Sequence, residues 1–354
     1  MCLAYLEHFG DRAQAVVQHP RYRRIFDRRA SRDLFEILAT SRTSVRRGLV
    51  KSILRSAASR KVAAKDRLYL NIGHTGLDDP GFASWVASAG VRPVYFVHDL
   101  IPITHPEYCR AGERERHVKR MRTILTTASG VIGNSQVTLD DLADFGRANG
   151  LASPPDVAAW LGKAEHPNPV KKPAPGRPTF VVLGTIEARK NHLMLLQVWQ
   201  RLIRRLGDDA PKLLIIGQRG WECEQVFDLL DRGDLKAAVT ELGNCSDDEL
   251  FGYLANARAL LFPSLVEGYG LPLIEALDAG APVIASNLPV FREIGDGVPE
   301  FLDPLDGPAW ENAILSYSTD GNGPRENQLK RLRSYHAPTW ETHFSKVEAW
   351  MGRL

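Results

Sequence analysis

Two glutamates eight positions apart, Glu267 and Glu275, flank a short loop of small and aromatic residues. A helix is expected to start at this loop because Pro272 suits a first helical turn, and the backbone N–H groups of Gly270 and Leu271 could then face a phosphate. Glu275, about one turn into the helix, could accept hydrogen bonds from two vicinal hydroxyls of a ribose. Glu267, on the loop, could reach another polar group such as a sugar.

A second loop carries two adjacent cations, Arg189 and Lys190, shortly after Gly184 and Thr185. Two adjacent cations at a helix start can hold phosphate oxygens, and in a reaction whose leaving group is a phosphate they stabilise the transition state more than the ground state. Arg189 offers a planar fork for phosphate oxygens, and Lys190 offers a point charge. Such a pair is also typical of a solvated helix start, and the glutamate loop favours the functional interpretation.

Alternating strands and helices must hold these loops. The apolar runs 259–265 and 281–285 bracket a helical segment that opens at Pro272 and is closed by Gly280, which predicts a strand–helix–strand unit. Further strands are expected at 179–183, 212–216 and 237–242, with a helix from about 191 to 206. Open α/β sheets bind ligands at the carboxyl ends of their strands, where both loops would lie.

The glutamate stretch has a recognisable order. It reads Glu267-Gly268-Tyr269-Gly270-Leu271-Pro272-Leu273-Ile274-Glu275, with Phe262-Pro263-Ser264 before it and Gly280-Ala281-Pro282-Val283 after it. This stretch resembles the E-x7-E signature of family 4 glycosyltransferases. That family has the GT-B fold, an α/β fold of two facing Rossmann-like domains with a deep interdomain cleft. Two acids at this spacing would mean little alone, whereas the order of both flanks is specific.

The resemblance implies a donor-binding site in the second half of the chain. Its residues would be the glutamate loop from Gly268 to Leu271 with Glu275, together with Gly184, Thr185, Arg189, Lys190, Gly217, Gly243 and Asn244. Thr185 departs from the family pattern, since many members have arginine there. Two structural alternatives stay open: Gly217 could be an ordinary strand-to-loop glycine, and Ser246 with Glu249 forms a capping box beside Asn244.

The first half is less regular, with strands expected within 67–74, 94–102 and 129–135 and a helix capped near Thr138. The resemblance places His98 at the donor sugar, across the cleft from Glu267. For His74 and Asp99 a purely structural role is as good an interpretation. The chain opens in what reads as the middle of a helix, so the usual first strand and glycine-rich turn are expected to be missing, through a late start or through degeneration of an inactive domain.

A segment with five prolines, 165–178, predicts an interdomain linker. We expect an acceptor domain at 1–168, a nucleotide-sugar domain at 177–335, and a last helix at 336–354 that packs back on the first domain. Trp340, Phe344, Val347 and Trp350 have helical spacing and predict packing rather than ligand contacts.

Composition excludes some classes of protein. Hydrophobic residues make up 44% and charged residues 25%, and the net charge of +3 gives no reason to expect nucleic acid. Scattered cysteines and the lack of a long apolar run predict a cytoplasmic protein. Basic residues within 42–61 and 110–122 could decorate helices that lie on an anionic membrane surface, although solvated helix faces explain them equally well.

The resemblance therefore implies a retaining glycosyltransferase with Glu267, His98, Arg189 and Lys190 in catalytic roles. No D-x-D occurs, so we expect no metal. The segments His98-Asp99-Leu100-Ile101-Pro102 and Phe291-Arg292-Glu293-Ile294 resemble bacterial mannosyltransferases of polysaccharide synthesis, which favours GDP-mannose as the donor and a saccharide or polyprenyl-diphosphate-linked acceptor. The alternatives are a sugar-nucleotide 2-epimerase and an inactive sugar-nucleotide-binding protein.

Overall fold

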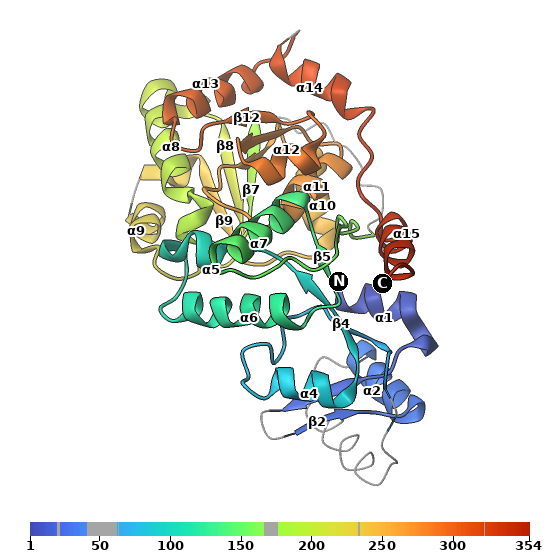
Figure 1. The fold of residues 1–354 in the computed structure, drawn as a ribbon. Coiled ribbons are helices and arrows are strands. Elements are labelled where there is room, and N and C mark those ends of the chain that lie inside the picture. Colours follow the sequence, from blue (N-terminus) through green and yellow to red (C-terminus); the bar gives the residue numbers. More distant parts are fainter. Residues whose placement is uncertain (20–21, 41–61, 63, 166–175, 233, 322) are drawn as a thin grey trace. The chain divides into compact units, whose positions relative to one another are not determined.

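The computed structural model describes residues 1–354 apart from 20–21, 41–61, 63, 166–175, 233 and 322. These residues form two compact units (Figure 1). Unit 1 consists of Met1–Ile103, Arg110–Leu161 and Trp340–Leu354, and unit 2 consists of Thr104–Cys109 and Gly162–Thr339. Most of the predicted linker lies outside the described residues.

Unit 2 is built on a six-stranded parallel sheet. Its strands are β7 (Thr179–Leu183), β8 (Lys212–Ile216), β9 (Val239–Leu242), β10 (Leu260–Phe262), β11 (Val283–Ser286) and β12 (Glu300–Leu302), in the order β12-β11-β10-β7-β8-β9. Counted from β7, this is the doubly wound order in which the chain changes direction between the first and fourth strands. That switch point lies between β7 and β10.

Helices cover both faces of this sheet, which is why its strands read as continuous apolar runs. They are α8 (His192–Leu206), α9 (Glu224–Arg232), α10 (Asp247–Asn256), α11 (Leu271–Asp278), α12 (Pro289–Gly295), α13 (Gly307–Ser318) and α14 (Pro324–Leu332). On one face Phe180 and Val182 of β7 pack with Trp199 of α8 and Trp310 of α13. On the other face, Phe262 of β10 stacks on the ring of Phe291 in α12, with centroids 4.6 Å apart.

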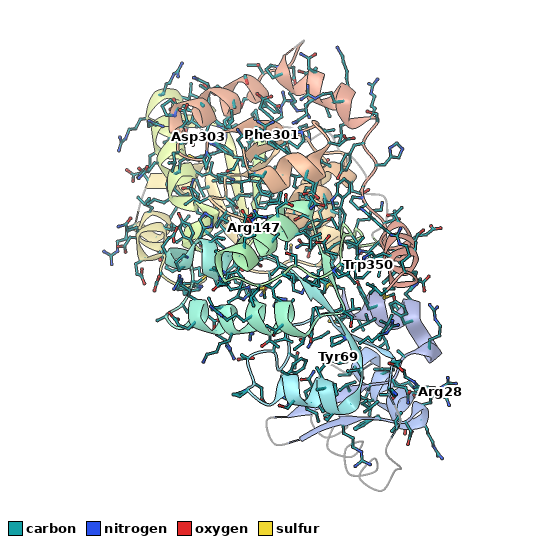
Figure 2. All side chains as sticks on the ribbon, in the orientation of Figure 1. Arg28, Tyr69, Arg147, Phe301, Asp303 and Trp350 are labelled. Carbon is teal, nitrogen blue, oxygen red and sulfur yellow. The ribbon has the colours of Figure 1, made fainter. Side chains whose placement is uncertain are left out.

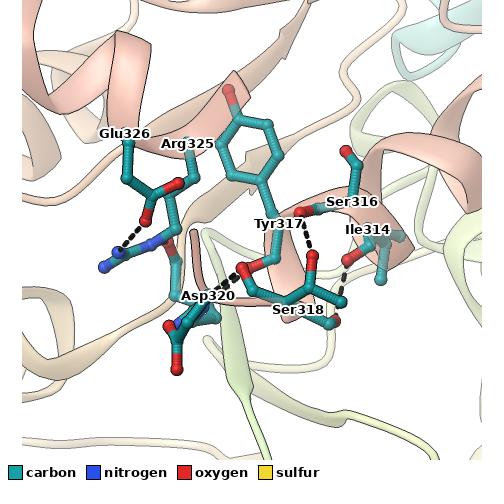
Figure 3. A network of polar contacts seen from close by, with 9 residues as sticks. Ile314, Ser316, Tyr317, Ser318, Asp320, Arg325 and Glu326 are labelled. Atoms are coloured by element: carbon teal, nitrogen blue, oxygen red, sulfur yellow. Dashed lines mark hydrogen bonds and ion pairs between the residues drawn. The ribbon is translucent and has the colours of Figure 1, made fainter. Parts of the chain in front are cut away.

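The end of α13 is fastened to the segment that enters β10. Arg258 donates from Nε to the Tyr317 carbonyl at 2.6 Å and from Nη2 to the Thr319 carbonyl at 2.7 Å. The neighbouring contacts, including the Arg325–Glu326 ion pair at 3.6 Å, are drawn in Figure 3. Burial raises the pKa of the Tyr317 hydroxyl. These contacts fix α13 against the sheet that carries the site.

Unit 1 has a parallel sheet of four strands in the order β3-β4-β5-β6, with the bounds β3 (Leu68–Asn71), β4 (Arg92–Val97), β5 (Gly130–Gly133) and β6 (Asp156–Ala158). A hairpin of β1 (Val16–His19) and β2 (Tyr22–Ile25) accompanies it. The helices are α1 (Cys2–Phe9), α2 (Arg28–Thr40), α4 (Phe82–Ala89), α5 (Ile101–Thr104), α6 (Glu113–Thr127), α7 (Gln136–Ala148) and α15 (Trp340–Met351). The cap of α7 is Ser135, whose Oγ accepts from the Thr138 N–H at 3.1 Å, so the helix is capped near Thr138 as expected.

Helix α15 belongs to unit 1 although it comes after the whole of unit 2 in the sequence. Tyr5 Oη of α1 lies 2.9 Å from His343 Nε2, and the rings of His8 and Phe344 stack with centroids 4.0 Å apart. Trp350, labelled in Figure 2, lies so close to Gly130 of β5 that a Cβ there would be 2.6 Å from its ring. Phe344, Val347 and Trp350 are buried, which confirms their predicted packing role.

Candidate functional site

Two loops meet at the switch point of unit 2. One loop leads from β7 to α8 and the other from β10 to α11, and their strands are neighbours in the sheet. The Leu265 N–H donates to the Arg189 carbonyl at 2.8 Å, and Asn191 Nδ2 donates to the Pro263 carbonyl at 3.2 Å. Asn191 has a left-handed backbone with φ 58°, which asparagine tolerates better than most residues. The two predicted loops are therefore joined into one structure.

The loops place Glu267 between Arg189 and Lys190. Arg189 Nη1 lies 2.9 Å from Glu267 Oε2, and Lys190 Nζ lies 2.5 Å from Glu267 Oε1. Ser264 Oγ donates to the same Oε1 at 2.8 Å. The Glu267 side chain is 8% exposed and the Lys190 side chain 11% exposed, so water screens this cluster only partly. Three of the four residues predicted as catalytic thus contact one another.

Three further residues, for which the sequence indicated no role in the site, complete the cluster: Glu187, Phe262 and Ser264. Glu187 Oε2 lies 3.2 Å from Arg189 Nε, on another edge of the guanidinium. Lys190 Nζ lies 5.2 Å from the centroid of the Phe262 ring, a cation–π distance. Ser264 and Phe262 stand in the flank that resembles the family signature, and Glu187 stands two positions before Arg189. All three residues stand in segments that the sequence singled out, but the sequence did not indicate which residues they contact.

Helix α11 begins where the sequence predicted, with Gly270 at its N-cap. Gly270 has φ 121°, and a Cβ there would lie 2.8 Å from the ring of Phe291, so both the backbone and the space require glycine. The first amides of a helix have no partner within the helix, which leaves those of Gly270 and Leu271 suited to an anion. Glu275 lies about one turn along α11 and is partly exposed, and Tyr269 is buried.

The other predicted donor residues lie at the same edge of the sheet, where β7, β8 and β9 end. Gly184 and the exposed Thr185 follow β7, Gly217 follows β8, and Gly243 with Asn244 follows β9. Asn244 Oδ1 accepts from Gln218 Nε2 at 3.0 Å. The capping box of Ser246 and Glu249 is confirmed.

Position 217 requires glycine for lack of space, because a Cβ there would lie 2.1 Å from the Gly184 carbonyl oxygen. We expect Gly217→Ala to push apart the loops after β7 and β8 and to lower the free energy of unfolding by about 3 kcal/mol. Urea unfolding would measure this change. Gly243→Ala is the matched control, because nothing lies within 4 Å of a Cβ at Gly243. Equal stability of the two variants would contradict the prediction.

Three histidines gather at the carboxyl ends of the unit 1 strands. Nε2 of His98 lies 2.9 Å from the Ile72 carbonyl, Nε2 of His74 lies 2.9 Å from the Phe96 carbonyl, and Nε2 of His117 lies 3.0 Å from the Asp99 carbonyl. His74 has a left-handed backbone with φ 57°. Burial lowers the pKa of His74 to about 3, and burial also lowers the pKa of His117. The sequence indicated His98 and left His74 open, whereas it gave no sign of His117.

Asp99 and Asn134 support this strand end. Asp99 Oδ1 accepts from the Ile101 N–H at 3.0 Å, at the start of α5, and Asn134 Nδ2 donates to the His98 carbonyl at 2.7 Å. Both side chains therefore have structural partners. His98 lies in unit 1 and Glu267 in unit 2.

Of the two basic segments that could lie on a membrane surface, the structure describes only the second. The segment 42–61 lies outside the described residues. In the segment 110–122, Arg116 Nε lies 3.0 Å from Asp78 Oδ2, Arg120 Nε lies 3.7 Å from Asp78 Oδ1, and Arg122 Nη2 lies 2.5 Å from Asn149 Oδ1. These three cations thus have partners within unit 1. Throughout the described ranges, no helix combines the length and the apolar character needed to cross a membrane.

Comparison with known proteins finds a family that the site-bearing part of the chain resembles. Residues 177–320 match the family described as "Glycosyl transferases group 1". This part of the chain is therefore similar to group 1 glycosyl transferases. The match spans both loops of the ion cluster and Glu275, and it agrees with the resemblance of the glutamate stretch to family 4 enzymes.

Curated relatives of the chain include bacterial mannosyltransferases. The chain is 33% identical over 224 residues to the O-antigen chain mannosyltransferase RfbU of Salmonella typhimurium, covering 62% of this chain and 58% of RfbU. It is 29% identical over 239 residues to the serotype-specific mannosyltransferase WbdA of Escherichia coli, covering 58% of this chain and 27% of WbdA. The chain thus spans less than two thirds of the length of either relative.

Solved structures show the same fold beyond this part of the chain. Sucrose-phosphate synthase from Thermosynechococcus elongatus matches with a TM-score of 0.61 and 19% identity, covering 96% of this chain and 85% of that one. TarM matches with a TM-score of 0.59 and 14% identity, covering 82% of this chain and 55% of that one. At such identities the likeness concerns the fold, and it confirms the predicted GT-B class with its two Rossmann-like units.

Proposed function

We propose that this protein is a glycosyltransferase that moves a sugar from a nucleotide to a saccharide acceptor. The observation that carries the proposal is the meeting of Arg189, Lys190 and Glu267 at the switch point of a domain similar to group 1 glycosyl transferases, beside the start of α11. Doubly wound sheets bind nucleotides at this point. Two cations and a helix start can stabilise a departing diphosphate, and Glu275 would hold the ribose.

The proposed reaction retains the configuration of the sugar. The bond from sugar C1 to the β-phosphate oxygen breaks while an acceptor oxygen bonds to C1 on the same face. The acceptor's proton passes to the leaving phosphate oxygen, so no side chain is needed as a base. Arg189 and Lys190 stabilise the charge on the diphosphate, and Glu267 would hold the sugar. Basic side chains here serve the role that a metal ion serves in other transferases.

We further propose GDP-mannose as the donor and a lipid-linked saccharide as the acceptor, in the synthesis of a cell-surface polysaccharide. The mannosyltransferase relatives support this choice of sugar. The acceptor would be reached at the inner face of the plasma membrane, where the exposed cations Arg114 and Lys119 of α6 would contribute to peripheral binding. Sedimentation with vesicles that contain anionic lipid tests this step, and binding that is unchanged in Arg114→Ala/Lys119→Ala would contradict it.

A thermal-shift panel of GDP-, UDP- and dTDP-sugars tests the donor. A ligand at about 100 times its Kd stabilises the native state by about 2.7 kcal/mol, and we expect the largest shift with GDP-mannose. Slow hydrolysis of the bound donor then identifies the chemistry. Release of nucleoside diphosphate supports a transferase, whereas an epimerised donor indicates a 2-epimerase. Binding without turnover, even with saccharide acceptors, indicates an inactive binding protein.

A further inference from the structure

The diphosphate-binding cations are already occupied by protein carboxylates. Glu267 bridges Arg189 and Lys190 with one oxygen on each, at 2.9 and 2.5 Å, and Glu187 contacts Arg189 Nε at 3.2 Å. The cluster therefore contains two positive and two negative charges. A diphosphate that binds these cations brings further negative charge, so it must compete with a carboxylate that is already in place.

Glu267 has the geometry of a phosphate substitute. Its two oxygens receive three donors, from Arg189, Lys190 and the buried Ser264, much as phosphate oxygens would. Glu187 differs from it, because it contacts only the Nε edge of Arg189 and stands on the same loop. Glu267 comes from the loop after β10, which also leads to the anion-binding start of α11. A diphosphate bound at the start of α11 would therefore lie close to the loop that carries Glu267, so it would compete with Glu267 before it competes with Glu187.

We infer that Glu267 holds Arg189 and Lys190 in place until a nucleotide sugar binds, and that the donor diphosphate then replaces it. The inference rests on the proposed function and adds an exchange of partners to it. The displaced carboxylate becomes an acceptor for hydroxyl groups of the same donor's sugar. Binding of the diphosphate and holding of the sugar are thereby coupled through one side chain. Before binding, the carboxylate keeps the cations oriented without leaving their charges unpaired.

The affinity for a nucleoside diphosphate without its sugar tests the exchange. Glu267→Gln removes the competing charge but keeps an oxygen that can accept from Lys190 and Ser264. We expect it to bind the nucleoside diphosphate on the order of tenfold more tightly than the wild type, about 1.4 kcal/mol, while sugar transfer is lost. Ser264→Ala loosens Glu267 without changing any charge, and we expect it to tighten binding by roughly twofold.

Two matched variants separate this exchange from a general charge effect. Glu241→Gln removes another ion-paired carboxylate of unit 2, 2.8 Å from Arg219, and we expect it to leave the affinity unchanged. Glu187→Gln removes a carboxylate from the same Arg189, and we expect at most a small change. Equal tightening by Glu187→Gln and Glu267→Gln, or weaker binding by Glu267→Gln with an unchanged thermal midpoint, would overturn the inference. Absence of nucleoside diphosphate binding in the wild type would instead overturn the proposed function.

Discussion

Lys190→Ala is expected to lower the rate of sugar transfer by about a hundredfold to a thousandfold. Removal of one fixed donor to charge that develops in a transition state typically has this effect. Lys190 is buried, and its Nζ is held by Glu267 beside the ring of Phe262, so its charge acts where water screens little. Steady-state kinetics with the donor found by the thermal-shift panel would measure kcat.

The control for this variant is Lys212→Ala, which removes an exposed lysine at the amino end of β8, opposite the site edge of the sheet. Urea unfolding separates a catalytic loss from a folding defect, because the variant also leaves Glu267 with one partner fewer. A kcat within threefold of the wild type in a folded Lys190→Ala protein would remove Lys190 from the proposed mechanism.

Mild acid is expected to destabilise the protein through histidines that are buried in the neutral form. Burial lowers the pKa of His74 to about 3, and burial with the charge of Lys190 lowers the pKa of His192 to about 4. In the unfolded chain both groups take up protons near pH 6.5, so below that pH the unfolded state binds more protons than the folded state. This stability is fully present above pH 6.5 and is lost as the pH falls towards 4 for His192 and towards 3 for His74.

Relative to pH 7.5, each of these histidines is expected to lower the free energy of unfolding at pH 5 by about 2 kcal/mol, and both together by about 4 kcal/mol. Urea unfolding at the two pH values measures the difference. His192→Gln should remove about half of it, whereas His336→Gln, at an exposed position, should leave it unchanged. A free energy of unfolding that stays constant between pH 7.5 and pH 5 would show that these imidazoles are not buried in the neutral form.

The strands of unit 2 could be read from the sequence because they are apolar on both faces and bounded by glycine and proline. The bounds of β7 and β8 agree with the prediction to the residue, whereas β9 is shorter, because Asp234–Ala237 form a turn of 3-10 helix before it. The hairpin of β1 and β2 and the short strand β6 were missed, since their residues show no sustained apolar run.

The sequence indicated the members of the ion cluster but not the contacts among them. Residue types and order indicated Glu267, Arg189 and Lys190, yet the pairing among them depends on β7 and β10 being neighbours, and no local pattern encodes that order. Glu187 stands two positions before Arg189 on the same loop, and residue order alone did not indicate that its carboxylate contacts the guanidinium. The sequence did not indicate His117 because this residue comes from α6, whose charged sequence is typical of a solvated helix, and not from a strand.

The placement of α15 in unit 1 has a consequence for synthesis of the protein. Unit 1 needs Phe344 and Trp350 to cover α1 and Gly130, but the ribosome makes these residues only after the whole of unit 2. At about 5–20 residues per second, the first part of unit 1 waits roughly 10–35 s with those apolar surfaces uncovered. Unit 2 can fold in that interval, whereas unit 1 cannot be completed. We therefore expect chaperones to bind unit 1 in nascent chains that are stalled before residue 340.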